Sequence, residues 1–436
     1  MFMASFLLLK GIRKCLPHLR VRRRAMASVN SGRRYVLGIE TSCDDTGAAI
    51  VDDSGNIISE VLSSQLRIHL RNGGIIPPVA RDLHKEKIES VVEECLMKSK
   101  LDISQLDAVA VTNRPGMPMS LLVGLGYAKV IAEKWKKPMI PVHHMEAHAL
   151  TIRMVEDVPF PFMTMLISGG HSLIGLAEDI NSWRLFGTTL DDAPGECMDK
   201  TARQLRLINL PQYESISGGA AIEHLAQSGD RNHFEFPVAM SMYRDCDTSF
   251  SGLKWKAKKY IMEEEKKHGT GPGEVIPTAA HLCASFQHSI ARQLCKKLER
   301  ALVYANQKEL LPPDRKRFVV SGGVACNGYI REMLTYICHR NGYELHAPPP
   351  KLCCDNGVMI AWNGMEKLKR GLDLTYEYDK VDMHPDEPFG VDERAEVAKA
   401  NIRTGYIKFP QSGWTSKPLK KNENSEEAEE KSSVAV

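Results

Sequence analysis

Two histidines, His144 and His148, stand four residues apart within the stretch 143–148. Side chains at this spacing project from one face of a helix, so both imidazoles can bind one divalent metal ion from the same side. A pair of surface or helix-capping histidines is the alternative, because short motifs also arise by chance. Asp355 favours the metal, since it supplies a carboxylate just before an apolar helical run at 358–362. These residue types predict a site of two imidazoles and one carboxylate.

Three glycine-containing segments, 38–47, 168–171 and 321–323, are candidate binding sites for phosphate or carboxylate oxygens. Glycine lets a ligand approach the backbone closely, and the exposed N–H groups of such turns hold anions. The third segment precedes a helix expected from about Tyr329, whose start adds further amides. Each segment alone is also typical of an ordinary hairpin turn, but their order along the chain favours a nucleotide site between two lobes.

Composition narrows the class of protein. The chain has 436 residues, of which 43% are hydrophobic and 25% charged, which is enough for two domains with a sizeable core. No window holds 18 consecutive apolar residues, so we expect no membrane insertion. The net charge of +3 is too small to indicate a nucleic-acid-binding protein, and any such function must depend on local patches. The 11 cysteines form no CxxC pair and are expected to be reduced thiols of a non-secreted protein.

The two ends differ from the rest of the chain. Residues 1–34 are rich in arginine and lysine, and no acidic residue occurs before Glu40. This composition predicts a mitochondrial presequence. A secretory signal is the competitor because 6–9 is apolar, but that run is short and the basic residues follow it. The polar, charge-mixed segment 412–436 is predicted to be a disordered tail.

Strand-like and helix-like periodicities alternate between these ends. In the first half we expect strands at 35–40, 46–52, 57–65, 107–112 and 139–142, and helices at 79–98, at 119–135 and over the histidine stretch. The second half opens in the same way, with strands at 161–168 and 172–177, and it continues through a helix-rich stretch to a strand at 318–320. This order predicts an α/β fold with duplicated lobes of the actin, Hsp70 and sugar-kinase type and a cleft between them. The lobes are expected at 35–155 and 156–411, the second with a helical insertion.

The chain from about 35 to 390 resembles the tRNA N6-adenosine threonylcarbamoyltransferases, formerly described as O-sialoglycoprotein endopeptidases, and with its presequence it resembles their mitochondrial branch. The motifs that carry the resemblance lie at 38–46, 73–77, 143–148, 168–171, 191–196, 247–254, 321–327 and 355–357. Together these motifs are highly specific, whereas no single one is. Arg114 and Cys354 depart from the usual residues of the family.

The resemblance implies transfer of a threonylcarbamoyl group from threonylcarbamoyl-AMP to N6 of adenosine 37 in tRNAs that read ANN codons. It also implies a mitochondrial location, a separate synthase that supplies the adenylate, a homodimer and one divalent metal ion per subunit, iron or zinc. His144, His148 and Asp355 match the metal ligands of the family. The positions that match its substrate-binding residues are Leu166, Ile167, Ser168, Gly169, Gly170, Asp199, Gly219, Glu223 and Asn327.

Several roles stay open at this point. Asp44, Asp45 or His171 is expected to accept the proton of the attacking amine, and the sequence does not choose among them. A metal-dependent glycoprotein endopeptidase is one alternative function, but Glu146 stands two residues after His144, not one, and is rotated by roughly 200° around a helix. An ATP-dependent small-molecule kinase, or a nucleotide switch, of the same fold is another alternative.

Two basic clusters are candidate tRNA contacts. One holds Lys254, Lys256, Lys258 and Lys259 beside Trp255, and the other holds Lys296, Lys297 and Arg300. Phosphate binding and an ordinary solvated helix face are both consistent with such clusters.

Overall fold

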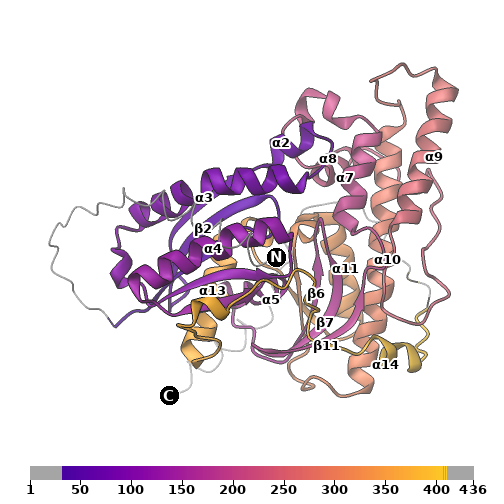
Figure 1. Ribbon diagram of the computed structural model, residues 1–436. Coiled ribbons are helices and arrows are strands. Elements are labelled where there is room, and N and C mark those ends of the chain that lie inside the picture. The colour runs from indigo at the N-terminus through magenta and orange to yellow at the C-terminus, as the bar shows by residue number, and fades with distance from the viewer. Residues whose placement is uncertain (1–31, 406, 408, 410–436) are drawn as a thin grey trace, which may run out of the picture. The chain divides into compact units, whose positions relative to one another are not determined.

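The computed structural model describes residues 32–405, 407 and 409. The predicted presequence, 1–34, lies almost wholly outside the described residues, and the predicted tail, 412–436, lies wholly outside them. Both therefore stay predictions. The two β-sheets described below belong to one compact unit that ends at Gly405, and Figure 1 shows how their strands and helices follow one another along the chain.

The first sheet has five strands in the order β3-β2-β1-β4-β5. Their bounds are Tyr35–Glu40 for β1, Asp45–Asp52 for β2, Ile57–Ser64 for β3, Ala108–Arg114 for β4 and Met139–His143 for β5. The strand β1 pairs antiparallel with β2 and parallel with β4, and β5 continues the parallel side. The carboxyl ends of β1, β4 and β5 therefore meet at one edge, where α/β proteins commonly bind ligands.

The second sheet repeats this pattern in the order β10-β9-β6-β7-β8-β11. Its strands are Phe162–Ile167 (β6), Ser172–Asp179 (β7), Ser182–Thr188 (β8), Arg317–Ser321 (β9), Glu344–His346 (β10) and Val391–Asp392 (β11). As in the first sheet, the opening strand β6 has an antiparallel neighbour, β7, and a parallel neighbour, β9. The predicted duplicated α/β fold is confirmed, and β8 supplies the third antiparallel strand that the sequence analysis did not identify.

Residues of the first sheet alternate between two hydrophobic clusters. Leu37 and Ile39 of β1 pack in the cluster that includes residues of the helices α3 (Pro77–Ser99) and α4 (Pro118–Trp135). Val36 points to the opposite face and packs with the helix α13 (Gly357–Arg370). This two-residue alternation follows from the pleat of a strand. Because both faces are covered, the strands are almost continuously apolar, as the sequence shows.

Helix α13 approaches the first sheet so closely that glycine is required at the contact. A Cβ atom at Gly38 of β1 would lie 2.2 Å from the backbone nitrogen of Ala361, and one at Gly47 of β2 would lie 2.8 Å from that of Gly357. The sequence analysis interpreted these two glycines as part of an anion-binding turn. The structure corrects this interpretation, because both lie within strands and their small size admits α13. Figure 1 shows this late helix beside first-half elements.

The histidine-bearing helix α5 (His144–Leu150) is buried along its whole length. Ala147 belongs to the cluster that α13 forms with the first sheet, whereas Met145, Ala149 and Leu150 pack with residues of the second sheet. Both sheets therefore hold this helix, which fixes its rotation about its own axis.

The remaining helices surround these layers. They are α2 (Leu66–Arg71), α6 (Ile152–Val155), α7 (Pro194–Gln204), α8 (Gly218–Ala226), α9 (Ser251–His268), α10 (Ala279–Gln307), α11 (Gly328–Arg340), α12 (Pro350–Cys353) and α14 (Arg394–Lys399). Short 3-10 turns lie at Ile103–Gln105, Leu207–Asn209, Pro211–Tyr213, Gly323–Cys326 and Tyr378–Lys380. Within the described part of the chain, no helix combines the length and the hydrophobicity that a membrane crossing needs.

The expected elements of the first half are confirmed to within about two residues at each end, with the helices α2 and α6 as additions. The predicted division into lobes at 155 and 156 stays a prediction. Although α13 follows five of the six strands of the second sheet in the chain, it packs on the first sheet. The order of elements alone did not indicate this packing.

Replacing Gly38 with alanine should lower the free energy of unfolding by about 1–3 kcal/mol, because the added methyl group meets backbone atoms that cannot rotate away. Urea unfolding followed by circular dichroism measures this change. Gly252→Ala in α9 is the matched control, since nothing lies within 4 Å of its added Cβ atom, and a gain of up to about 1 kcal/mol is expected there. Equal stabilities of the two variants would contradict the close contact with α13.

Candidate metal centre and substrate site

The helix α5 begins directly after β5 because His143 caps it. The Nδ1 atom of His143 accepts hydrogen bonds from the backbone N–H groups of Met145, at 3.2 Å, and Glu146, at 3.5 Å. The first helical residue is therefore His144, and His148 follows one turn later on the same face. The cap thus sets the position at which both imidazoles leave the helix.

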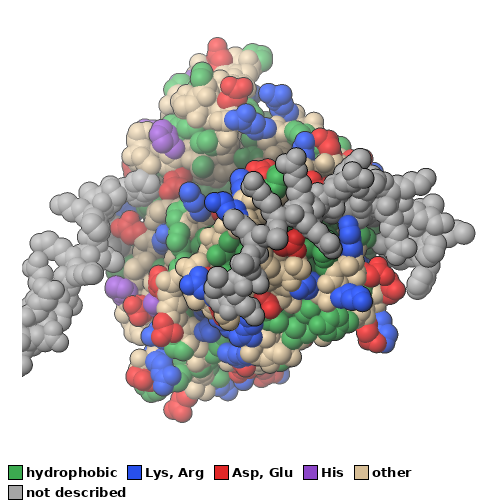
Figure 2. All heavy atoms as spheres, turned by 90° about the vertical axis from the view of Figure 1, so that its left-hand side faces the viewer, with side chains coloured by type: hydrophobic (Ala, Val, Ile, Leu, Met, Phe, Trp, Pro, Cys, Tyr) green, Lys and Arg blue, Asp and Glu red, His purple; other side chains and the backbone are tan. Residues whose placement is uncertain are grey.

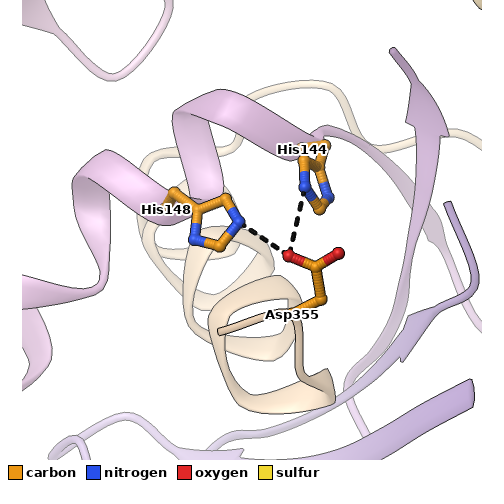
Figure 3. A group of neighbouring side chains, drawn as sticks. All are labelled: His144, His148 and Asp355. Atoms are coloured by element: carbon orange, nitrogen blue, oxygen red, sulfur yellow. Dashed lines mark hydrogen bonds and ion pairs between the residues drawn. The ribbon is translucent and has the colours of Figure 1, made fainter. Parts of the chain in front are cut away.

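Asp355 reaches the two histidines from the segment that precedes α13. Its Oδ1 atom lies 3.0 Å from Nε2 of His148 and 3.5 Å from Nε2 of His144. One potential ligand atom from each of the three residues lies within 4.8 Å of the others, and this is the one such group in the described part of the chain. Figure 3 shows the two rings leaving one helix toward the carboxylate. The structure brings together the three residues that the sequence analysis selected.

The start of α13 determines where Asp355 lies. The side chain of Asn356 caps this helix, because its Oδ1 atom accepts a hydrogen bond of 2.8 Å from the backbone of Met359. Its Nδ2 atom donates to the backbone oxygen of Cys354 at 2.7 Å. Asp355 thus lies between two anchored residues, Cys354 and Asn356, just before the first residue of α13, which packs on the first sheet.

Glu40 supports the site from behind His144. This buried carboxylate at the end of β1 accepts hydrogen bonds from the backbone of Ser42, at 2.5 Å, and from the hydroxyl of Thr112 at the neighbouring strand β4. It also lies 3.4 Å from Nδ1 of His144, which contacts the hydroxyl of Ser42 at 3.0 Å. The sequence analysis did not identify Glu40. The sequence feature that could have identified it is a glutamate at the end of an otherwise apolar strand.

The electrostatics of the group suit a cation. Burial by itself raises the pKa of Asp355, but the adjacent His144 and His148 hold that pKa well below its usual range. Burial lowers the pKa of His144, and the carboxylates of Asp355 and Glu40 raise it to about 10. Two carboxylates therefore face positive charge in a water-poor environment. Two imidazole nitrogens and a carboxylate oxygen that converge in this way match the preferences of divalent iron and zinc.

The predicted substrate turn follows β6. Leu166 and Ile167 end that strand, and Ser168 begins the turn, where its hydroxyl accepts hydrogen bonds from the backbone of Gly170, at 3.3 Å, and His171, at 3.1 Å. Open space surrounds Gly169 and Gly170, where an added Cβ atom would have no neighbour within 4 Å. These two glycines therefore leave their backbone accessible to a ligand.

Hydrogen bonds join the other predicted substrate-binding residues in pairs. Asp199 of α7 accepts from the backbone of Gly219 at 2.9 Å, and Glu223 of α8 accepts from the backbone of Gly328 at 2.7 Å. Asn327 precedes Gly328 and caps α11. Its amide also donates to Gln287 at 2.8 Å, so both ends of this side chain already have protein partners.

The three candidate proton acceptors differ in their environments. Burial raises the pKa of Asp45 to about 7, with the charge of Asp44 as the next cause. Burial also raises the pKa of Asp44, and the charge of Asp355 adds to the effect. Burial lowers the pKa of His171 to about 4, and its ring centroid lies 6.5 Å from that of His144. Near neutral pH, Asp45 is therefore the candidate that exchanges a proton most readily.

Glu146 lies in a different environment from the two metal-ligand candidates on its helix. Burial raises its pKa to about 7, and the charges that lower it belong to Lys367 and Arg114. One of its carboxylate oxygens is buried without a hydrogen-bond partner. The residue is not a member of the group formed by the two histidines and Asp355. This placement agrees with the rotation of roughly 200° from His144 that the helix imposes.

The fold and the site together define a duplicated α/β protein with a candidate metal centre of two histidines and one aspartate. Comparison with known proteins identifies the family. Residues 56–362 match the family model described as tRNA N6-adenosine threonylcarbamoyltransferase. The mitochondrial tRNA N6-adenosine threonylcarbamoyltransferase of Rattus norvegicus is 47% identical over 376 residues, which cover 86% of this chain and 91% of the relative. The chain belongs to this family.

Other relatives agree with this membership. The human protein of the same name is 46% identical over 376 residues, covering 86% of this chain and 91% of the relative. A bacterial tRNA N6-adenosine threonylcarbamoyltransferase, from Rhizobium etli, is 36% identical over 370 residues, covering 83% of this chain and 95% of the relative. The family resemblance inferred from the sequence motifs is confirmed.

Replacing Asp355 with asparagine should lower the bound metal to less than half an equivalent per chain, because the carboxylate that faces both imidazoles is lost. Inductively coupled plasma mass spectrometry of protein purified and dialysed under reducing conditions measures this content. Glu146→Gln is the control, since it also replaces a carboxylate with an amide and lies on the same helix as the two histidines, and it should keep the metal. The assignment of ligands is wrong if the Glu146 variant loses the metal and the Asp355 variant keeps it.

Proposed function

We propose that this protein works in mitochondria and transfers a threonylcarbamoyl group from threonylcarbamoyl-AMP to N6 of adenosine 37 in tRNAs that read ANN codons. The observation that carries the proposal is the family match over residues 56–362, which spans the two histidines and Asp355. The mitochondrial location is supported by the names of relatives that are 46–47% identical. A homodimeric state and a separate synthase that supplies the adenylate stay predictions of the resemblance.

The reaction places clear demands on the residues of the site. The exocyclic amine of adenosine is a weak nucleophile, so the carbonyl that it attacks must be activated and held, and AMP must depart. The open backbone at Gly169 and Gly170 suits the phosphate and carbonyl oxygens of the adenylate. The hydrogen bonds from Gly219 to Asp199 and from Gly328 to Glu223 hold these two predicted substrate-binding carboxylates in fixed positions. Such fixed donors and acceptors lower the barrier because they need no reorganisation during the reaction.

We assign one divalent metal ion, iron or zinc, to His144, His148 and Asp355. The Nε2 atoms of both histidines already face the carboxylate, and Glu40 and Ser42 hold the other nitrogen of His144. Outer partners of this kind fix the orientation of a ligating imidazole. When bound, such a metal supplies Lewis acidity and leaves coordination positions open to substrate oxygens.

Asp45 is the residue that we assign as proton acceptor. Its pKa of about 7 lies near physiological pH, and a general base is most effective when its pKa is close to the pH at which it works. His171 serves less well because its pKa of about 4 makes it a weak base.

The endopeptidase alternative requires Glu146 to activate water at the metal. Its surroundings argue against this role, because the cations that act on it are Lys367 and Arg114, and it is not a member of the group formed by the two histidines and Asp355. A small-molecule kinase of the same fold has no evident use for two histidines that converge on an aspartate. The transferase is therefore the function that the site supports best.

Reconstitution tests the proposed function directly. Purified protein is mixed with a threonylcarbamoyl-AMP synthase, threonine, bicarbonate, ATP and an ANN-decoding tRNA, and the digested nucleosides are analysed by mass spectrometry. We expect N6-threonylcarbamoyladenosine, and none from a control tRNA with guanosine at position 37. Absence of the modified nucleoside with metal-loaded protein would reject the transferase, and cleavage of a glycoprotein in its place would favour the endopeptidase.

The pH dependence of transfer tests Asp45. Since the deprotonated carboxylate is the base, kcat/KM should rise with pH through about 7 and then level off. Asp44→Asn removes a neighbouring negative charge that raises this pKa, so the rise should move to lower pH. Asp45→Asn should remove the rise and slow transfer by about 10²–10⁴-fold. An unchanged rise in the Asp45 variant would assign the proton transfer to another residue.

A further inference from the structure

The long helix α10 is mostly buried, and two of its positions that are not buried carry basic side chains. Arg292 and Lys296 lie four residues apart, on one face of the helix, and both are partly exposed. Burial lowers the pKa of Lys296, and the positive charges of Arg300, Lys297, Arg244 and Arg292 lower it further. Arg244 of the loop before α9 is therefore close to this face. We call Arg244, Arg292 and Lys296 the α10 basic patch.

The charge of this patch is not neutralised by the protein. Within residues 32–405, no carboxylate forms an ion pair with any of its three members. The neighbouring cations are different, because Lys297 is buried and pairs with Asp245 at 2.7 Å, and Arg300 is buried and donates to the backbone of Ile402 at 3.2 Å. The sequence analysis grouped Lys296 with Lys297 and Arg300, and the structure separates them into one surface cation and two internal ones.

The lysines of α9 are the competing candidate, and two of the four already have carboxylate partners. Lys254 pairs with Asp192, Lys259 lies 3.8 Å from Glu263, and the helix continues with acidic residues at 263–265. Figure 2 shows a different face, the left-hand side of Figure 1, and there too cations and anions are interspersed where the surface is not covered by grey atoms. The α10 basic patch differs in having three cations and no paired anion, so it is the stronger attractor for a polyanion.

Exposed apolar and aromatic side chains adjoin the patch. Met242 is 84% exposed and Tyr243 is 61% exposed, and they directly precede Arg244. The loop that carries Met242 and Tyr243 also contacts the patch through Ser241, whose backbone oxygen lies 3.4 Å from the Lys296 ammonium. An aromatic ring beside cations is a surface on which an unpaired base can stack while its phosphates are bound.

The loop that carries Arg244 leads to the candidate active site. Four residues further on, the hydroxyl of Thr248 lies 3.3 Å from that of Ser172, which follows His171. A chain spans at most about 3.6 Å per residue, so Arg244 lies within about 14 Å of Thr248. Arg244 is therefore within reach of phosphates that lie a few nucleotides from an adenosine in the site.

We propose that the α10 basic patch, together with Tyr243, binds the backbone of the tRNA substrate next to the adenosine that is modified. This inference rests on the proposed function, because it needs tRNA as the substrate. In this arrangement the patch binds tRNA irrespective of base sequence and fixes its position, and the residues of the site select the reacting adenosine.

The double variant Arg292→Glu/Lys296→Glu tests the proposal with full-length protein and a fluorescently labelled ANN-decoding tRNA. Fluorescence anisotropy should show that Kd rises by about tenfold or more. The slope of log affinity against log salt should fall by about two, one for each lost phosphate contact. Metal content and melting temperature should be those of the unaltered protein. Tyr243→Ala should weaken binding with an unchanged salt slope.

Lys258→Glu/Lys259→Glu on α9 is the matched control, because it makes the same change in charge on exposed side chains. It should bind tRNA nearly as well as the unaltered protein. Normal binding by the α10 variant, or equal weakening by the α9 variant, would overturn the patch. If the patch is overturned but the unaltered protein still modifies tRNA in the same samples, the proposed function stands. If the unaltered protein neither binds nor modifies tRNA, both the patch and the proposed function are rejected.

Discussion

The close contact of α13 with the first sheet is the constraint on which the site depends. Gly38 and Gly47 admit the helix to a distance that any side chain would prevent, and Gly357 in turn lies against the backbone of Ala48. Asp355 stands two residues before that helix and is held in place by the cap at Asn356. The lack of a side chain at Gly38 and Gly47 thus determines the position of the Asp355 carboxylate.

Burial of the histidine helix is the second half of the same arrangement. Because both sheets pack on α5, the helix cannot rotate, and His144 and His148 must face Asp355. Glu40 gains its importance from the same burial, since a carboxylate enclosed without partners would be costly. Its contacts with Ser42, Thr112 and His144 satisfy it and orient the imidazole. The packing that forms the core therefore also sets the geometry of the reacting groups.

Local patterns in the sequence were sufficient for most elements and for the two histidines, whereas Asp355 was selected by its place before an apolar helical run and by its match to the metal ligands of the family. The strands of the first half are apolar runs bounded by polar turns, and His144 and His148 share a helix, so short-range periodicity located them. The roles of Gly38 and Gly47 were not predictable in this way, because their partner α13 lies more than 300 residues away. Glu40, β8 and the separation of Lys296 from Lys297 depend likewise on tertiary contacts. Patterns within a segment cannot report which other segment covers it.

The central claim is that both sheets position two imidazoles and one carboxylate around a single metal ion. X-ray diffraction of metal-loaded crystals, recorded above and below the absorption edge of the bound metal, tests it most directly. We predict one anomalous peak per chain, within about 2.0–2.2 Å of Nε2 of His144, Nε2 of His148 and a carboxylate oxygen of Asp355. A peak bound by other residues, or none in protein that carries an equivalent of metal, would contradict the account.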